Sequence, residues 1–261
     1  MKVLGIIPAR IGSTRLPAKA LKFIGDKTVV QRVWEQATKA ACFEELFVAT
    51  DSSEIADCVK GFGGSVLMTG SHHATGSDRV AEALELREKA GKHFDLVANV
   101  QGDMPFIEPG VIRRTVQCLA EADPTFGMST VVMPLFDENE FKRDSVVKVV
   151  LGVDGRALYF SRAPIPHRRD PEKCEISPTA PIGYKHFGLY VFRPATLKAL
   201  NKMSPSLIET REALEQLRAL ANGILIKAAF ATPEEMNASI EIDTSEDLSR
   251  AVAAVQSGKA R

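Results

Sequence analysis

Four charged residues of this 261-residue chain each follow an apolar segment with the character of a β-strand. They are Arg10, Asp51, Asp103 and Asp243, and the preceding segments are residues 3–8, 46–50, 96–100 and 239–242. In an open α/β sheet, ligands bind beyond the carboxyl ends of the strands. Loop solvation explains any one of these residues, but it explains all four less readily. The pattern therefore predicts that one cation and three carboxylates gather at one edge of a sheet.

The first of these segments leads into a loop, residues 8–19, in which Arg10, Arg15 and Lys19 lie within ten positions. Gly, Ser and Thr residues separate the cations, so the loop can offer backbone N–H groups and charged side chains to a polyphosphate. It lacks the GxxxxGK[ST] pattern of a Walker P-loop, and no GxGxxG follows the first strand. We interpret it as a polyphosphate-binding loop of another kind.

Strand-like and helical segments alternate in the first half of the chain. Strands are expected at 3–8, 46–50, 65–68 and 96–100, and helices at 29–41, 55–62, 78–89 and 109–122. Such alternation is typical of a mostly parallel sheet with helices on both faces. The sequence therefore predicts an α/β fold with a Rossmann-like sheet.

The pattern changes between residues 127 and 193, where strand signals dominate. The expected strands are residues 128–133, 146–150, 157–160 and 188–192, interrupted by a Pro- and Arg-rich loop at 164–181. Helical spacing returns at 205–220 and 246–255, and no repeat or long linker is evident. We expect a single domain, residues 1–261, with a β-rich insert at about 127–193.

Composition excludes several classes of protein. Lys and Arg total 33, as do Asp and Glu, so the formal net charge is zero, which argues against nucleic acid as a partner. No apolar run approaches the ~20 residues of a membrane span. The four cysteines have no CxxC spacing, and adjacent His72 and His73 are interpreted as loop residues, not as a metal pair. We expect a cytoplasmic protein with idle thiols.

Longer motifs make the chain similar to a known family. They are Ile7-Pro8-Ala9-Arg10 through Lys19, Val48-Ala49-Thr50-Asp51, Thr75-Gly76-Ser77-Asp78-Arg79, Asn99-Val100-Gln101-Gly102-Asp103, Val147-Lys148-Val149-Val150, Ala157 through Pro166, His186-Phe187-Gly188-Leu189-Tyr190 and Leu214-Glu215-Gln216-Leu217-Arg218. Together they resemble the 3-deoxy-D-manno-octulosonate (KDO) cytidylyltransferases, or CMP-KDO synthetases, nearly end to end. The Ala157–Pro166 and Leu214–Arg218 runs are the most specific, because many nucleotidyltransferases have an Asp after a strand.

The resemblance implies a reaction and its cofactor. CMP would pass from CTP to the anomeric hydroxyl of a KDO-type acidic sugar, with release of pyrophosphate, as part of lipopolysaccharide synthesis. Asp103 and Asp243 are assigned to Mg²⁺, which prefers hard oxygen ligands. Arg10 and Lys19 would hold the triphosphate as catalytic residues, with Arg15 a further candidate. The other expected nucleotide contacts are Pro8, Ala9, Thr75, Gly76, Ser77, Arg79 and Gln101.

By the same resemblance, the sugar lies toward the β-rich segment. The candidate contacts are Arg162, His186, Tyr190 and Glu209. An anionic sugar needs a cation or several donors for its carboxylate, which Arg162 and His186 could supply. A histidine bonded within a strand pair is the alternative interpretation of His186. The family pairs through this segment, so we expect a two-fold homodimer.

Two departures from the family pattern fall on the sugar side. Met104 follows Asp103 where the family usually has Glu, and Lys185 precedes His186 where it usually has Arg. We expect KDO as the sugar, with an 8-amino analogue of KDO as the nearest alternative. A cytidylyltransferase for a nine-carbon sialic-type acid or a polyol phosphate is a more distant one. A non-catalytic nucleotide-sensing protein on the same fold is the alternative from another class, and retention of both Asp103 and Asp243 argues against it.

Overall fold

The computed structural model describes residues 1–13, 15–73, 75–169, 180–236 and 240–258. These residues form a nine-stranded sheet, with a separate ribbon of β2 (Phe23–Ile24) and β3 (Lys27–Thr28). In spatial order the main strands are β11 (Leu225–Phe230), β7 (Phe126–Leu135), β10 (Gly183–Phe192), β6 (Leu96–Asn99), β1 (Val3–Pro8), β4 (Glu45–Thr50) and β5 (Val66–Met68). All neighbours on this path are parallel except those that include β10. The predicted mostly parallel sheet is confirmed.

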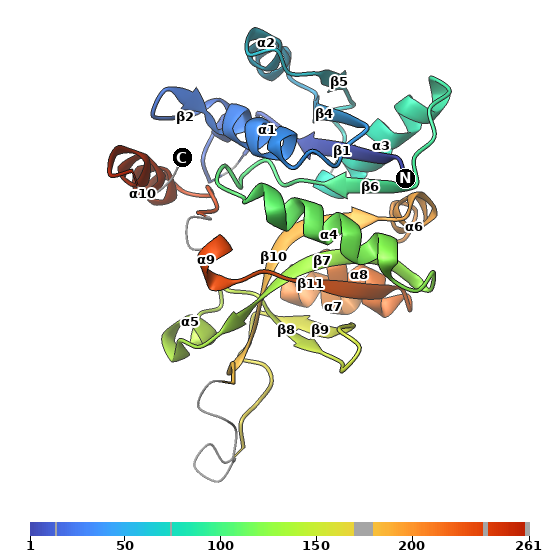
Figure 1. Cartoon of the computed structure of the whole chain (residues 1–261), viewed down its shortest axis with the longest axis vertical. Helices are drawn as coiled ribbons and strands as arrows, with labels where there is room; N and C mark the ends of the chain where they lie inside the picture. Colours follow the sequence, from blue (N-terminus) through green and yellow to red (C-terminus); the bar gives the residue numbers. More distant parts are fainter. Residues whose placement is uncertain (14, 74, 170–179, 237–239, 259–261) are drawn as a thin grey trace.

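Helices cover both faces of the sheet because its central strands are apolar on both sides. Along β1, Ile7 packs with α1 (Val29–Lys39), α2 (Ser53–Gly61) and α4 (Pro109–Glu121), whereas Ile6 packs with the opposite layer. That layer consists of α3 (Gly76–Lys89), α6 (Pro194–Leu200) and α8 (Gln216–Ala221) (Figure 1). Strands buried on both faces are typical of parallel sheets. The two cores together fix the carboxyl ends of β1, β4 and β6 at one edge.

Threonine caps determine where two helices begin at that edge. Thr75 accepts a hydrogen bond from the backbone of Asp78, whose side chain accepts one from the Thr75 backbone, and α3 starts there. Thr244 and Asp247 form the same capping box at the start of α10 (Ser245–Gln256). An N-cap of this type contributes about 1 kcal/mol to stability. The loop before α3 and residue Asp243 therefore sit beside fixed helix ends.

The β-rich segment, residues 127–193, contributes four strands to the nine-stranded sheet, and two of them, β7 and β10, lie on its main path. β7 and β10 are each ten residues long, and β10 begins at Gly183, five residues before the expected 188. The register shifts between Phe187 and Tyr190, at the boundary where β10 leaves β8 for β6. The strands β8 (Lys148–Leu151) and β9 (Ala157–Ser161) extend the lower half of β10 in Figure 1, and α5 (Glu138–Lys142) lies nearby.

Two predicted segments differ from the structure, and some elements were missed. The single helix expected at 205–220 is two helices, α7 (Leu207–Glu212) and α8, because Ala213 adopts a left-handed conformation with φ 51°. β11 and α6 were not predicted. The strand expected at 239–242 is wrong for the described residues 240–242, which belong to no strand, and Ser239 lies outside the described residues. A backbone hydrogen bond from Ile242 N to Asp103 O, 2.9 Å, holds this segment instead.

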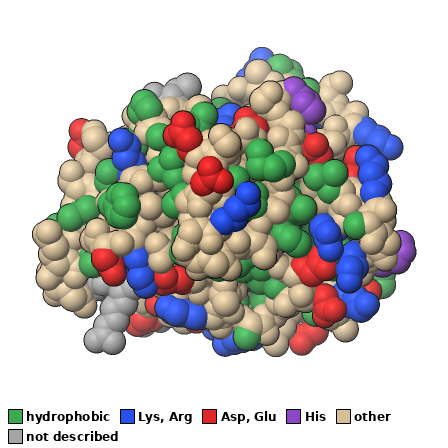
Figure 2. All heavy atoms as spheres, turned by 90° about the horizontal axis from the view of Figure 1, so that it is seen from above, with side chains coloured by type: hydrophobic (Ala, Val, Ile, Leu, Met, Phe, Trp, Pro, Cys, Tyr) green, Lys and Arg blue, Asp and Glu red, His purple; other side chains and the backbone are tan. Residues whose placement is uncertain are grey.

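The remaining short elements are the 3-10 turn η1 (Lys19–Leu21) and the helix α9 (Pro233–Met236). Figure 2 shows one face of the molecule, on which basic and acidic side chains are interspersed, as the zero net charge leads one to expect. Within the described ranges, no helix is long and apolar enough to cross a bilayer. Cys42, Cys58 and Cys118 carry free thiols, and Cys174 lies outside the described residues.

Candidate active site

A polar cleft opens beyond the carboxyl ends of β1 and β6, and we call it the first cleft. It is lined by Pro8, Ala9, Arg10, Ser13, Arg15, Lys19, Ala20, His73, Thr75, Gly76, Arg79, Gln101, Gly102, Asp103 and Asp243. The structure thus brings together nearly all the residues predicted to bind nucleotide. Ser77 is the exception, because it faces an adjoining cavity. Asp103 and Asp243 meet here although they are far apart in the chain.

A glycine permits the close approach of the two strand ends. A Cβ atom at Gly102 would lie 2.6 Å from the carbonyl oxygen of Pro8, a distance that side-chain carbons do not tolerate. Without a side chain at residue 102, the turn after β6 packs directly on the end of β1. Asp103 is thereby carried to the loop that contains Arg10 and Lys19.

Lys19 lies between the two carboxylates that were predicted to bind metal. Its Nζ is 3.0 Å from Asp103 Oδ2 and 3.0 Å from Asp243 Oδ1, and Arg15 is 3.1 Å from the other oxygen of Asp243. Burial alone would lower the pKa of Lys19, but the charges of Asp103 and Asp243 raise it above its ordinary value. The carboxylates of Asp103 and Asp243 therefore concentrate negative charge at a point where a cation is bound, here the ammonium group of Lys19.

The residues present also fit a magnesium ion. Mg²⁺ is usually bound through one or two carboxylates, with waters and substrate phosphates as its other ligands. Asp103 and Asp243 converge on one ammonium group, which stands in for a cation at that place. The described chain has no cluster of three or more His, Cys, Asp or Glu suited to a metal, so phosphate oxygens would have to complete the set.

Asp51, the fourth strand-end residue, does not line the first cleft. Its Oδ1 is 3.4 Å from a nitrogen of Arg79, whose side chain is buried. Arg79 also donates hydrogen bonds to Thr69 Oγ1 at 2.5 Å and to Gly70 O at 3.3 Å. These contacts fix Arg79 in the wall of the cleft, and Asp51 serves as one of its supports.

His73 is a lining residue that the sequence did not single out. It lies in a loop, as predicted, and its Nε2 is hydrogen-bonded to the carboxylate of Glu82. Glu82 accepts a second hydrogen bond from the backbone N–H of Gly70 at 2.8 Å. The sequence did not indicate this role. His73 lies in a loop and Glu82 lies nine residues later in α3, so no periodic pattern connects the two residues.

A second cleft adjoins the first and shares Gln101 and Asp103 with it. Its other lining residues are Met104, Ser145, Val146, Val147, Lys185, His186, Gly188, Tyr190, Leu214, Gln216 and Glu241. Desolvation, followed by the charges of Asp103 and Asp243, raises the pKa of Glu241 to about 7, although the residue keeps exposed surface. Because Asp103 borders both clefts, ligands bound in the two clefts would meet at this carboxylate.

His186 and Tyr190 lie in the second cleft, where the sugar was expected. His186 Nε2 is 2.9 Å from Thr130 Oγ1 on the neighbouring strand β7, so the alternative of a strand-pair contact also holds. Burial lowers the pKa of His186 to about 3. The ring is thus neutral near pH 7, and it offers hydrogen bonds instead of charge.

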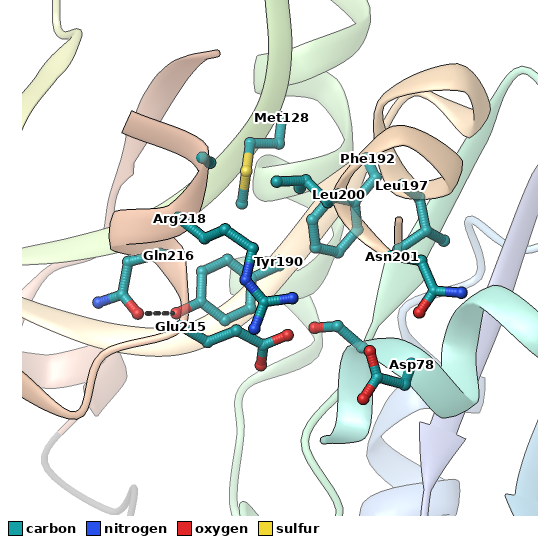
Figure 3. A pocket seen from close by; sticks show the side chains of 12 residues that line it. Asp78, Met128, Tyr190, Phe192, Leu197, Leu200, Asn201, Glu215, Gln216 and Arg218 are labelled. Carbon is teal, nitrogen blue, oxygen red and sulfur yellow. Dashed lines mark hydrogen bonds between the residues drawn. The ribbon is translucent and has the colours of Figure 1, made fainter. Parts of the chain in front are cut away.

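Gln216 is a second residue that was not singled out. Tyr190 OH donates a hydrogen bond of 3.0 Å to Gln216 Oε1, drawn as a dashed line in Figure 3. The amide nitrogen of Gln216 is buried and has no hydrogen-bond partner among the described residues. Buried donors usually have a partner, so this nitrogen is suited to a ligand oxygen. The Leu214–Arg218 run was the available signal, but it did not distinguish Gln216 from its neighbours.

Arg162 and Glu209 are not brought into either cleft. Arg162 donates from Nε to Glu212 O at 2.8 Å and from a terminal nitrogen to Asp144 O at 3.2 Å. Glu209 forms a buried pair with Arg218, at distances from 2.6 to 3.2 Å. Both side chains thus hold neighbouring segments together in this structure.

The two departures from the family pattern both lie in the second cleft. Met104 is 1% exposed and packs in the core with Ile107 and Val111. Lys185 Nζ is 2.9 Å from Glu140 Oε1 and 4.9 Å from the ring centre of Phe187. Neither residue is among those that line the first cleft.

Tyr190 and Gln216 also line the adjoining cavity that Ser77 faces, as Figure 3 shows. Apolar side chains line much of it, including Met128, Phe192, Leu197 and Leu200. Glu215, at its edge, accepts a hydrogen bond of 3.1 Å from Thr75 Oγ1, and burial raises its pKa above the ordinary value. This contact links the loop of the first cleft with the helix that carries Gln216.

An α/β sheet with a cation-rich loop, paired aspartates and two adjoining clefts defines a nucleotidyltransferase-type site. Residues 4–228 match the model of a family described as cytidylyltransferase. A 3-deoxy-manno-octulosonate cytidylyltransferase of Syntrophotalea carbinolica is 45% identical over 96% of this chain and 97% of its own length. A 3-deoxy-manno-octulosonate cytidylyltransferase of Bacteroides thetaiotaomicron is 44% identical, over 96% of this chain and 97% of its own length. The chain belongs to the 3-deoxy-manno-octulosonate cytidylyltransferase family.

Solved structures agree with this assignment. The structure of a CMP:2-keto-3-deoxy-manno-octonic acid synthetase complexed with CTP is 34% identical, with a TM-score of 0.87, and the match covers 99% of this chain and 100% of that one. A glucose-1-phosphate thymidylyltransferase of Bacillus anthracis shares the fold at 17% identity, with a TM-score of 0.62 over 97% and 95% of the two chains.

Proposed function

We propose that this protein transfers CMP from CTP to the anomeric hydroxyl of KDO, giving CMP-KDO and pyrophosphate. The observation that carries the proposal is the position of Asp103 at the border of two clefts. One cleft is lined by cations suited to a triphosphate, and the other by polar side chains suited to a sugar. Family membership supplies the identity of the two substrates. CMP-KDO would then be consumed in lipopolysaccharide synthesis.

CTP would lie in the first cleft. Arg10, Arg15 and Lys19 would hold the triphosphate through charge-assisted hydrogen bonds, which are shorter and stronger than neutral ones. Pro8, Ala9, Thr75, Gly76, Ser77, Arg79 and Gln101 would surround the cytosine and ribose. The buried contacts that fix Arg79 support this, because a prepositioned guanidinium discriminates between bases better than a mobile one.

The acidic sugar would lie in the second cleft. Lys185 provides a cation for its carboxylate, and His186 and the free amide of Gln216 provide hydrogen-bonding groups for its hydroxyls. Arg162 and Glu209, the other candidates from the resemblance, lack a place in the cleft here and would act through neighbouring segments. Both clefts end at Asp103, so the anomeric hydroxyl and the α-phosphate would meet there.

Asp103 and Asp243 would hold Mg²⁺ together with phosphate oxygens. When bound, the ion neutralises phosphate charge and lowers the pKa of the attacking hydroxyl. Lys19, Arg10 and Arg15 would stabilise the charge that develops on the phosphates as pyrophosphate leaves. The residues bring the two substrates into line, and no covalent intermediate with the protein is needed.

Two further proposals concern the whole protein. Exposed apolar side chains at Phe136, Val153, Leu158 and Phe230 lie in or near the β-rich segment, which supports a homodimer that pairs through it. The free thiols of the three described cysteines support the cytoplasm as the compartment, since reducing compartments keep thiols unpaired.

A competition assay tests the choice of sugar. KDO, 8-amino-KDO and a nine-carbon sialic-type acid would be supplied at equal concentration with CTP and Mg²⁺. We expect CMP-KDO as the main product and the 8-amino analogue as the nearest competitor, since Lys185 and Met104 change the second cleft and leave the first intact. A higher kcat/KM for the sialic-type acid would contradict KDO as the substrate.

A further inference from the structure

Lys148 is a fully buried lysine whose ammonium group contacts only backbone oxygens in the hydrogen bonds described. The residue lies at the start of β8 and is 0% exposed. Its Nζ donates hydrogen bonds to Arg143 O at 2.7 Å, to Val146 O at 2.6 Å and to Arg162 O. Burial lowers the pKa of this ammonium below its ordinary value. An ammonium buried in this way is costly unless its donors are satisfied, and three carbonyls match its three protons.

The three carbonyls come from two segments, of which one lines the second cleft and the other lies outside it. Arg143 and Val146 belong to the segment 143–147, of which Ser145, Val146 and Val147 line the cleft. Arg162 follows the end of β9, where its backbone and the Ser161 hydroxyl are bound to Glu212. The ammonium therefore ties the lining segment to a second, independently anchored part of the chain.

We propose that Lys148 is a positioning residue that holds the segment 143–147 in place as a preformed wall for the acidic sugar. The proposal rests on the proposed function, because it assigns the second cleft to the sugar. A methionine at this position would avoid the desolvation of a charge, and buried ionic groups are often replaceable by apolar ones without loss of stability. The presence of a lysine at this position is thus better explained by its role in holding the segment 143–147 in place than by a contribution to stability alone.

The test compares Lys148→Met with a matched control, Arg193→Met. Arg193 also donates hydrogen bonds to three backbone carbonyls, those of Phe126, Leu119 and Ala122, but it lines neither cleft. Both variants lose a cation that donates hydrogen bonds to backbone carbonyls, so the comparison isolates the effect of its position. Only the loss at residue 148 should disturb the sugar.

We expect Lys148→Met to raise KM for KDO at least about tenfold and to leave KM for CTP within about twofold, since small displacements of a positioning segment are costly. Arg193→Met should leave both KM values within about twofold of the wild type. Equal KM for KDO in Lys148→Met and wild type, with wild-type activity present, would overturn the inference. A wild-type protein inactive with KDO would instead overturn the proposed function.

Wild-type protein provides a second measurement that does not depend on a variant that folds. Hydrogen exchange of a peptide that covers residues 143–147 is followed with and without KDO. We expect the exchange rate to be the same in both states, because in the free protein the ammonium already holds the segment and the backbone N–H groups of Arg143 and Val146 already donate to Glu140 O and Arg143 O. Fast exchange that slows only when KDO binds would show that the sugar orders the wall, and it would overturn the role of Lys148.

Discussion

At the scale of single residues, the proposed transfer of CMP depends on Asp103. This carboxylate lies 3.0 Å from Lys19 in the first cleft and also borders the second cleft. Asp243 reaches the same ammonium from the other end of the chain. Two carboxylates that face one cation, next to a loop rich in Arg and Lys, form a site for a metal-bound polyphosphate.

Asp103→Asn and Asp243→Asn should each lower kcat by about 10³-fold or more, because a preorganised charge at the reacting phosphate is lost. The fold should persist, since both carboxylates are partly exposed. Pyrophosphate release at saturating Mg²⁺ measures the effect. Asp57→Asn, on an exposed face of α2, is the matched control and should retain full activity. Wild-type turnover in either cleft variant would refute the metal assignment.

The burial of His186 should make the free energy of unfolding depend on pH. Its pKa is lowered to about 3 in the folded protein, from an ordinary value of 6.5. Between these pH values the unfolded chain binds a proton that the folded chain does not. The free energy of unfolding should therefore fall as pH falls below about 6.5, with a slope that approaches about 1.4 kcal/mol per pH unit.

Urea denaturation at pH 7 and pH 5 measures this slope. His186→Gln should weaken the pH dependence, because the substituted side chain does not titrate. His93→Gln replaces an exposed histidine and should leave the slope close to that of the wild type. An unchanged slope in His186→Gln would mean that other groups cause the acid sensitivity.

Much of the site could be predicted at this scale because its residues follow recognisable segments. Arg10 and Asp103 lie shortly after strands that the apolar pattern identifies, and Lys19 ends the cation-rich loop that follows the first of these strands. His73 and Gln216 were missed, since their roles depend on contacts with Glu82 and Tyr190 that no local pattern reveals. Long-range contacts of this type form only when the whole sheet is assembled.

At the scale of elements, α7 and α8 are held together by the buried pair of Glu209 and Arg218. The predicted continuous helix failed here because Ala213 takes a left-handed conformation, which ends α7 and turns the chain back. Helical spacing persists across the break, so no local pattern indicates it. The turn lets Arg218 reach Glu209 and places Gln216 against Tyr190.

Glu209→Gln should lower the free energy of unfolding by about 3 kcal/mol, because it leaves the buried Arg218 without its charge partner. KM for KDO should stay close to that of the wild type, since Glu209 lies outside the second cleft. Chemical denaturation and steady-state kinetics measure the two effects. Glu88→Gln, which removes an exposed pair with Lys198, is the control and should cost less than about 1 kcal/mol. A large rise in KM without loss of stability would restore Glu209 as a sugar contact.

The other errors at this scale also have physical causes. The segment 240–242 has the apolar character of a strand, but it is anchored by a single backbone hydrogen bond to Asp103 and packs with Leu16, Ile24 and Phe106. β11 was missed because it completes the sheet through its pairing with β7, a partner nearly a hundred residues earlier in the chain. Such pairings carry no local sequence signal.

At the scale of the whole molecule, one sheet brings two clefts to a common edge and leaves apolar side chains exposed near the β-rich segment. Light scattering at micromolar concentration should give about twice the 28.4 kDa mass of the chain, since cyclic dimers are the commonest symmetric assembly. Leu158→Asp, in β9, should shift the protein toward a monomer, whereas Met68→Asp, an exposed position in β5 at the opposite edge of the sheet, should leave the dimer intact. A wild-type monomer would contradict pairing.

Pyrophosphate release tests most directly whether CMP passes between ligands held in the two adjoining clefts. Purified protein is supplied with CTP and Mg²⁺, with and without KDO, and both pyrophosphate and CMP-KDO are quantified. One pyrophosphate should form for each CMP-KDO, and almost none should form when KDO is omitted. CTP binding without turnover, for KDO and every other sugar acid offered, would contradict the account and favour a nucleotide-sensing protein on the same fold.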